Sequence, residues 1–177
     1  MPATDSSSPR HDLIRLVEVL DSHQVEYLLV GGAAARAYGA KRPTEDADCV
    51  VRRERANLDR LAGAMRELNA RLRVHGMTDD EARQLPVQLD GKMLASAEIS
   101  TWMTDAGGLD VLSGLTGADG SLLPYEDLVA RATVIRGAGF AIRAAALQDI
   151  ITAKEHADRP KDRDALPELR TLRDAAS

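Results

Sequence analysis

Apolar residues recur along the first part of the chain with two different periods. Between Asp12 and Ser22 they return every three or four positions, which predicts an amphipathic helix. The run VEYLLV over 25–30 is rich in strand-forming residues and predicts a short strand. It stops at Gly31-Gly32, and the segment from Ala33 to Tyr38 has high helix propensity. The predicted order is therefore helix, strand, glycine turn and short helix.

The remaining pattern also mixes strands and helices. A strand is predicted over Asp46–Val51 (DADCVV), and a long helix from Arg55 to about Leu72. Residues 73–92 are expected to be irregular. Later elements are strands over 99–103 and 109–112, a helix over 124–132, a hairpin over 133–143 and two helices from Leu147 broken near Pro160. This order predicts an α/β (α+β) fold: a small mixed sheet flanked by helices, with a helical C-terminal part.

Length and composition indicate one ordinary globular domain. The chain has 177 residues, of which 44% are hydrophobic. We expect a loose N-terminal segment over 1–10, a core over 11–145 and a helical part of the same domain over 146–177. No apolar run approaches membrane-spanning length and no signal peptide is visible, so a cytoplasmic protein without a membrane partner is expected.

Charge and cysteine content narrow the function classes. The single cysteine, Cys49, excludes a disulfide framework and is expected to be a small buried residue. The net charge of −5 means that a nucleic-acid partner would need a local basic patch. One candidate patch surrounds the predicted helix break, at Lys154, His156, Arg159, Lys161 and Arg163, although interleaved acids make a solvated helix face equally plausible.

The glycine pair is a candidate phosphate site. Without Cβ atoms, Gly31 and Gly32 let backbone N–H groups approach an anion closely, and the following helix points its positive end at the same place. An isolated Gly-Gly is more often a plain turn, and the fuller phosphate motifs GxGxxG and GxxxxGK[ST] are absent. The pair therefore gains meaning only from its neighbours.

Two acids in the next strand are candidate metal ligands. The two-residue period puts Asp46 and Asp48 on one face, whereas Ala47, Cys49 and Val51 face the core. Adjacent carboxylates suit Mg²⁺ or Mn²⁺, the alternative being a solvated strand edge.

A third acid extends this set. Asp110, in GGLDVL, lies in an apolar run and is either a third ligand or a structural acid that accepts backbone hydrogen bonds. If the glycine turn and these acids share one end of the sheet, they form the arrangement that a nucleoside triphosphate with its metals requires.

Three ordered segments resemble a known superfamily. VEYLLVGGAAARAYGAKRPTEDADCVV, GGLDVL and LQDIITAKEHADRPKDRDALPEL are similar to the DNA polymerase beta-like nucleotidyltransferases. Within that superfamily, the segment RPTEDADCVV most resembles the AbiEii-like toxins of type IV toxin–antitoxin systems. The resemblance implies that Gly31 and Gly32 contact the triphosphate, as do Lys154, Arg42 and Thr44. It also implies that Asp46, Asp48 and Asp110 bind metal, and that these acids and Lys154 form the catalytic set.

The resemblance also implies a reaction and its partners. A nucleoside monophosphate would pass from a nucleoside triphosphate to an acceptor hydroxyl, with RNA such as tRNA as acceptor, Mg²⁺ (or Mn²⁺) as cofactor and a cognate antitoxin protein as partner. Alternatives are an antitoxin-type or antibiotic nucleotidyltransferase that acts on a protein or a small molecule, and a non-catalytic nucleotide-binding module.

Overall fold

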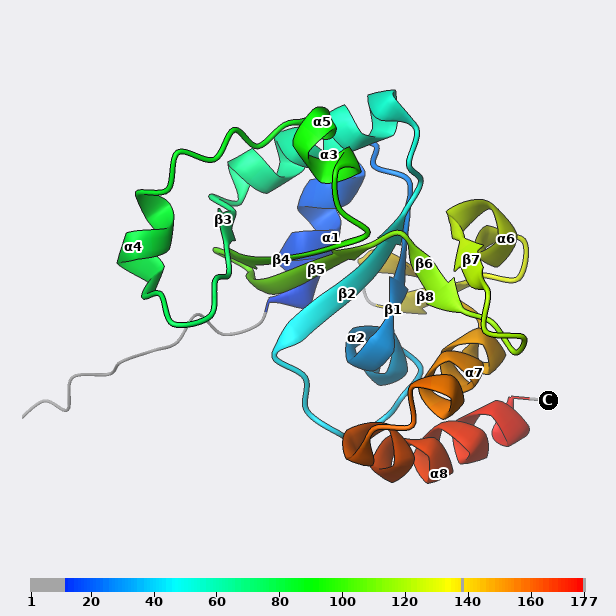
Figure 1. Ribbon diagram of the computed structural model, residues 1–177. Coiled ribbons are helices and arrows are strands. Elements are labelled where there is room, and N and C mark those ends of the chain that lie inside the picture. The colour runs from blue at the N-terminus through cyan, green and yellow to red at the C-terminus, as the bar shows by residue number, and fades with distance from the viewer. Residues whose placement is uncertain (1–11, 138, 177) are drawn as a thin grey trace, which may run out of the picture.

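The chain folds around a mixed sheet, seen in a computed structural model that describes residues 12–137 and 139–176 (Figure 1). The sheet has seven strands in the order β3-β4-β5-β2-β1-β9-β8. Their bounds are β1 Tyr27–Val30, β2 Asp46–Val51, β3 Arg71–Leu72, β4 Ile99–Thr104, β5 Gly107–Leu112, β8 Thr133–Gly137 and β9 Phe140–Ala144. Strand β2 pairs parallel with β5 and antiparallel with β1. The predicted α/β class with a mixed sheet is confirmed.

Helices cover both faces of this sheet (Figure 1). Helices α1 (Leu13–Ser22) and α3 (Arg55–Glu67) pack together on one face, and α2 (Gly31–Ala37) packs on β1 and β2. The paired C-terminal helices are α7 (Leu147–Ala157) and α8 (Pro160–Ala175). The shorter helices are α4 (Asp79–Arg83), α5 (Gly91–Ala95) and α6 (Tyr125–Val129). Among the residues described, no helix is long and apolar enough to cross a membrane.

Strand β2 shows how the sequence divides the two faces. Ala47, Cys49 and Val51 are buried in the core, as their phase predicted, whereas Asp46 and Asp48 are only partly buried. Cys49 is confirmed as a small buried residue. On β4, Trp102 is buried in the same core. The opposite face of the sheet is therefore the one that presents polar side chains.

The predicted helix over 55–72 is wrong at its end. Helix α3 stops at Glu67, Asn69 has a left-handed φ of 50°, and Arg71–Leu72 pairs with β4 as the edge strand β3. The apolar stripe continues past the end of the helix because Leu68 and Leu72 still pack on the core after the chain has left the helix. Tertiary pairing decided between two local structures that the pattern permits.

The segment 73–92 contains more structure than predicted. Helix α4 begins with a capping box in which Thr78 and Glu81 exchange hydrogen bonds, and Asp90 caps α5. A small second sheet, β6 (Gly114–Thr116) with β7 (Leu122–Pro124), was not predicted. The helix expected over 124–132 is shortened to α6, and the expected hairpin over 133–143 is present as β8–β9, with position 138 of its turn outside the described residues.

Candidate functional site

Strand register brings the predicted acids together. Asp48 lies opposite Asp110 in the parallel β2–β5 pair, and opposite Val30 in the β1–β2 pair. Paired residues project to the same face, so the Asp48 and Asp110 side chains are neighbours there. Because Val30 directly precedes Gly31, the glycine turn begins beside the same two carboxyls.

Crowding of these acids changes their chemistry. Burial, the hydrogen bond to Asp110 and the nearby charges of Asp110 and Asp46 raise the pKa of Asp48 to about 7, and Lys154 opposes the shift. Asp110 Oδ1 is buried without a hydrogen-bond partner. The site therefore has excess negative charge and an unsatisfied oxygen, which is the condition a bound cation relieves.

Two glycines make room for the carboxylates. Gly31 has a φ of 60°, and a Cβ there would overlap Asp48 Oδ2. A Cβ at Gly108 would overlap Asp46 Oδ1 in the same way. Gly108 was not predicted as a site residue. Its signal in the sequence was the GGLDVL stretch itself, but its need for a bare backbone follows only from the β2–β5 register, which sets it opposite Asp46.

The loop before β2 supports the glycine turn. Thr44 Oγ1 donates a hydrogen bond of 2.9 Å to the carbonyl of Asp46. A Cβ at Gly32 would lie 3.0 Å from that hydroxyl oxygen, so Thr44 packs directly on the turn. The Arg42 carbonyl accepts a hydrogen bond of 3.2 Å from Arg36, which ties the loop to the end of α2.

Lys154 is positioned by a buried acid that was not predicted. Lys154 Nζ lies 3.3 Å from Oδ1 of Asp162, whose side chain is completely buried. Arg159 Nε donates to the other carboxylate oxygen at 2.6 Å. Burial alone would raise the pKa of Asp162, but the hydrogen bond from Arg159 and the charge of Lys154 outweigh it and lower the pKa. A single carboxylate thus fixes two cations at the α7–α8 junction.

One cleft of about 800 Å³ contains the whole predicted set. Its lining includes Gly31, Gly32, Arg42, Thr44, Asp46, Asp48, Asp110 and Lys154. The basic lining residues come from the loop before β2 and from the C-terminal helices: Arg42, Lys154, Arg159 and Lys161. Ile99, Leu112 and Leu115 form an apolar wall on β4, β5 and β6. The three aspartates therefore share the cleft with a group of basic residues and with an apolar wall.

A further residue, Arg73, contacts the acids and was not predicted. Its Nη1 lies 3.2 Å from Oδ1 and 3.3 Å from Oδ2 of Asp46. Arg73 follows the edge strand β3, and its backbone N–H donates to the Thr101 carbonyl on β4. No local signal could have identified it, because the contact joins segments 27 residues apart across three strands.

The acids fit a divalent cation in part. Carboxylate oxygens suit Mg²⁺ or Mn²⁺, and the unpartnered Oδ1 of Asp110 lies beside Asp48. Asp46 instead contacts Arg73, and within the described residues no group of three or more acids, histidines or cysteines is arranged around a common metal position. Asp48 and Asp110 are therefore ready as ligands, whereas Asp46 would have to leave Arg73.

The fold is similar to that of known nucleotidyltransferases. The lincosamide antibiotic adenylyltransferase LnuA, in its lincomycin-bound crystal structure, aligns with a TM-score of 0.60 at 13% identity, over 91% of this chain and 96% of that chain. ANT(2'')-Ia in complex with adenylyl-2''-tobramycin aligns with a TM-score of 0.54 at 17% identity, over 92% of both chains. No protein-family model and no curated protein matches the chain. These likenesses establish a nucleotidyltransferase-type fold.

Proposed function

We propose that this protein transfers a nucleoside monophosphate from a nucleoside triphosphate to an acceptor hydroxyl. The observation that carries the proposal is the Asp48–Asp110 pair, which lies beside the Gly31 turn in one cleft with Lys154. A nucleotidyl transfer needs a phosphate cradle, clustered carboxylates and fixed cations within reach of one triphosphate. The glycine turn, the acids and Lys154 line one cleft and are our candidates for these three roles.

In this proposal, the phosphates lie between the glycine turn and the C-terminal helices. Gly31 and Gly32 line the cleft at the start of α2, and the first N–H groups of a helix have no intrahelical partner. Lys154 and Arg159 face the triphosphate from the opposite wall and offset its charge. Asp162 holds both cations in place before the substrate arrives, so they lose little side-chain entropy on binding.

The acids would hold Mg²⁺ or Mn²⁺, with Asp48 and Asp110 as ligands and Asp46 joining them. When bound, the metal would neutralise phosphate charge and lower the pKa of the acceptor hydroxyl. The acceptor oxygen forms a bond to the α-phosphorus while the bond to the bridging oxygen breaks and pyrophosphate leaves. Asp110, which lies beside Asp48 in the cleft, is our candidate to receive the hydroxyl proton.

The distribution of charge in the cleft favours a small molecule as acceptor. The cations line the side formed by the C-terminal helices and the loop before β2, where the triphosphate is proposed to bind. The wall formed by Ile99, Leu112 and Leu115 is apolar and offers no counter-charge to a polyanion. Two proteins of similar fold are antibiotic-modifying enzymes, which supports the same acceptor class.

The resemblance to AbiEii-like toxins supports a different acceptor, an RNA such as tRNA, together with a cognate antitoxin partner. The observation that favours an RNA acceptor is the basic cluster at the α7–α8 junction, where Lys161 and Arg163 are exposed. Acids lie among them, and Arg163 Nε pairs with Asp158 at 2.9 Å. We therefore rank RNA second, with the antibiotic class first.

A labelling experiment tests both levels of the proposal. The protein is incubated with each α-labelled nucleoside triphosphate and Mg²⁺, in the presence of lincomycin, tobramycin, total tRNA or no acceptor. We expect label on a small hydroxyl compound, and loss of transfer by at least about a hundredfold in Asp48→Asn and Asp110→Asn. Asp80→Asn, at an exposed position of α4, is the control and should keep full activity.

The outcomes separate the alternatives. Label on tRNA would replace the small-molecule acceptor by RNA, and label on the protein itself would favour protein modification. Saturable triphosphate binding without transfer to any acceptor, unchanged by Asp48→Asn, would show a nucleotide-binding module and overturn the proposed activity.

A further inference from the structure

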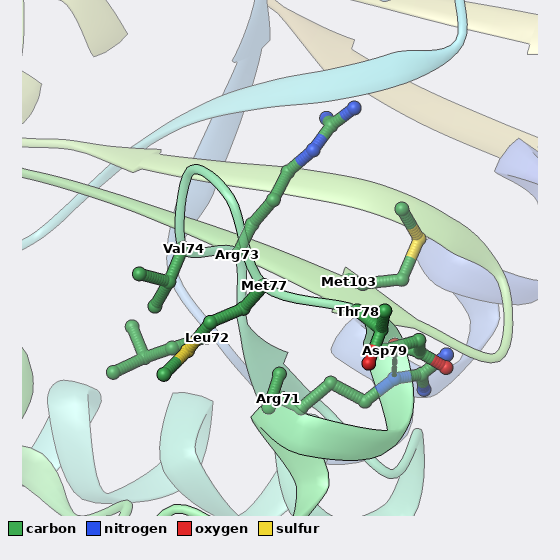
Figure 2. A pocket seen from close by; sticks show the side chains of 9 residues that line it. Arg71, Leu72, Arg73, Val74, Met77, Thr78, Asp79 and Met103 are labelled. Carbon is green, nitrogen blue, oxygen red and sulfur yellow. Dashed lines mark hydrogen bonds and ion pairs between the residues drawn. The ribbon is translucent and has the colours of Figure 1, made fainter.

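The side chain of Arg73 lies between two features of the molecule. On one side is a hollow of about 230 Å³, lined by Leu72, Val74, Met77, Met103 and neighbouring residues of β3, α4 and β4. On the other side is Asp46. Figure 2 shows the Arg73 side chain extending away from the other labelled side chains of the hollow. Its guanidinium ends at the Asp46 carboxylate, 3.2 Å from Oδ1.

The sheet register explains why Arg73 arrives at this place. Thr101 on β4 lies opposite Asp110 on β5, which in turn lies opposite Asp48 on β2. The Arg73 N–H donates to the Thr101 carbonyl, so Arg73 extends this row by one strand position. Residues of one row project to one face of a sheet. Arg73 is therefore built onto the face that carries the carboxylates.

The contact is poorly suited to a purely structural role. The Arg73 side chain is 47% exposed and that of Asp46 is 35% exposed, and ion pairs of this exposure contribute little to stability. One nitrogen reaches both carboxylate oxygens, so the pair lacks the two-nitrogen fork of a strong arginine–carboxylate contact. What the contact does supply is positive charge beside three crowded acids.

We propose that Arg73 is a positioning residue that holds Asp46 in the metal-free protein and competes with a divalent cation for it. This inference rests on the proposed function. Asp48 and Asp110 would hold the cation, and Asp46 would join them by exchanging the Arg73 guanidinium for it. Because Gly108 on β5 has no side chain, the Asp46 carboxylate lies close to β5. Strand β5 is also the strand that carries Asp110.

The surroundings of Arg73 permit this exchange. Strand β3 has only two residues, and positions 74–81 that follow Arg73 are exposed. Arg73 and Asp79 both line the adjoining hollow, so the released side chain has a neighbouring space and a carboxylate toward which it can turn. The exchange therefore needs a side-chain movement and leaves the sheet intact.

Metal binding without nucleotide tests the inference directly. Mn²⁺ is titrated into the full chain at neutral pH and followed by calorimetry, for the wild type, Arg73→Ala, Arg73→Lys and Arg83→Ala. Arg83 belongs to the same segment and pairs with Asp79 at 3.3 Å, which makes it a matched control. We expect Arg73→Ala to bind Mn²⁺ about three- to tenfold more tightly, because one competing charge near the site is lost. Arg73→Lys should lie closer to the wild type, and Arg83→Ala should equal it.

A second readout is the melting temperature. Because an exposed ion pair contributes little to stability, Arg73→Ala without metal should melt close to the wild type. Mn²⁺ at the same concentration should raise the melting temperature of Arg73→Ala more than that of the wild type, because the variant binds the ion more tightly. Unchanged or weaker Mn²⁺ affinity in Arg73→Ala, with a wild type that binds, would overturn the competition while leaving the proposed metal site intact. If neither the wild type nor Arg73→Ala binds Mn²⁺, both the inference and the metal part of the proposed function fail.

Discussion

At the scale of single residues, the cleft depends on positions where a side chain is absent. Gly31 has a left-handed φ of 60° and faces Asp48, while Gly108 faces Asp46. At each position a methyl group would occupy the space of a carboxylate oxygen. Each glycine therefore permits a close approach of an acid to the backbone of a neighbouring element.

Replacement of Gly31 by Ala should be more costly than its backbone angle alone explains. Gly76 has a φ of 82° with nothing near its missing Cβ, so Gly76→Ala measures the conformational cost alone, about 1 kcal/mol. Gly31→Ala should lose about 1–3 kcal/mol more, because Asp48 must shift, and should also lose triphosphate binding. Urea denaturation of both variants checks the difference, and equal losses would contradict the contact with Asp48.

The raised pKa of Asp48 predicts a pH-dependent stability of the metal-free protein. The folded-state pKa of about 7 exceeds the ordinary value of 3.8, so the folded state binds the proton more tightly than the unfolded state. Stability should therefore fall as the pH rises from about 4 to about 7 and then level off. Asp48→Asn removes this slope, and at pH 8 it should be more stable than the wild type by roughly 2 kcal/mol.

Denaturation curves in a metal chelator at pH 4 and pH 8 check this expectation. The stability advantage of Asp48→Asn should be much smaller at pH 4, where ionisation of Asp48 in the unfolded state has only begun. Addition of Mn²⁺ at pH 8 should stabilise the wild type and have less effect on Asp48→Asn. A constant difference between the two proteins across pH would show that burial and the neighbouring acids do not raise the pKa of Asp48.

Some of these residues could be predicted from sequence and others could not. Asp46 and Asp48 follow from the two-residue period of one strand, and Asp110 from an acid in an apolar run. Gly108, Arg73 and Asp162 depend on which strands or helices become neighbours. Asp162 in particular lies in a mixed-charge segment, where burial of one acid is decided by the packing of α7 on α8.

At the scale of elements, the α7–α8 junction fixes the basic wall of the cleft. Helix α7 ends at Ala157, its C-cap residue Asp158 has a left-handed φ of 48°, and Pro160 begins α8. The break was predicted from that proline. Asp162 accepts hydrogen bonds from the N–H and the side chain of Arg159, and so caps α8 while it holds Lys154. One acid thus links helix initiation to the charge of the site.

Replacement of Asp162 by Asn should weaken both the junction and nucleotide binding. Loss of a buried charge that pairs with two cations should cost about 2–4 kcal/mol of stability. Lys154 would lose its partner, and the KM for the triphosphate should rise about tenfold while kcat changes less. Asp158→Asn is the control, because Asp158 belongs to the same junction but is exposed. If both variants have the same KM for the triphosphate and the same stability, Asp162 does not position Lys154.

The end of helix α3 could not be predicted from the local pattern of apolar residues. The apolar stripe from Leu58 to Leu72 is continuous, yet the chain leaves the helix after Glu67 and joins the sheet. In the edge strand, Arg71 is buried and pairs with Asp79 on α4 and with Asp105 on the turn after β4. Without this edge strand, Arg73 would not reach Asp46, so the error in the predicted helix also concealed a site residue.

At the scale of the whole molecule, the cleft divides its charge between two walls. The C-terminal helices and the loop before β2 carry the cations, with Glu45 and Glu168 among them, whereas Ile99, Leu112 and Leu115 of β4, β5 and β6 are apolar. The net charge of −5 leaves this arrangement as the local source of attraction for a triphosphate. The two walls should therefore be separable by mutation.

A kinetic comparison with the acceptor found by labelling tests this division. Arg42→Ala with Lys161→Ala should raise the KM for the triphosphate and leave the KM for a small-molecule acceptor nearly unchanged. Ile99→Ser should do the reverse, raising the acceptor KM about three- to tenfold because apolar contact is lost. The Ile99 side chain is 63% exposed, so its truncation should not unfold the protein. If removing the two cations raised the acceptor KM instead, with a steep dependence on salt, the acceptor would be a polyanion such as RNA.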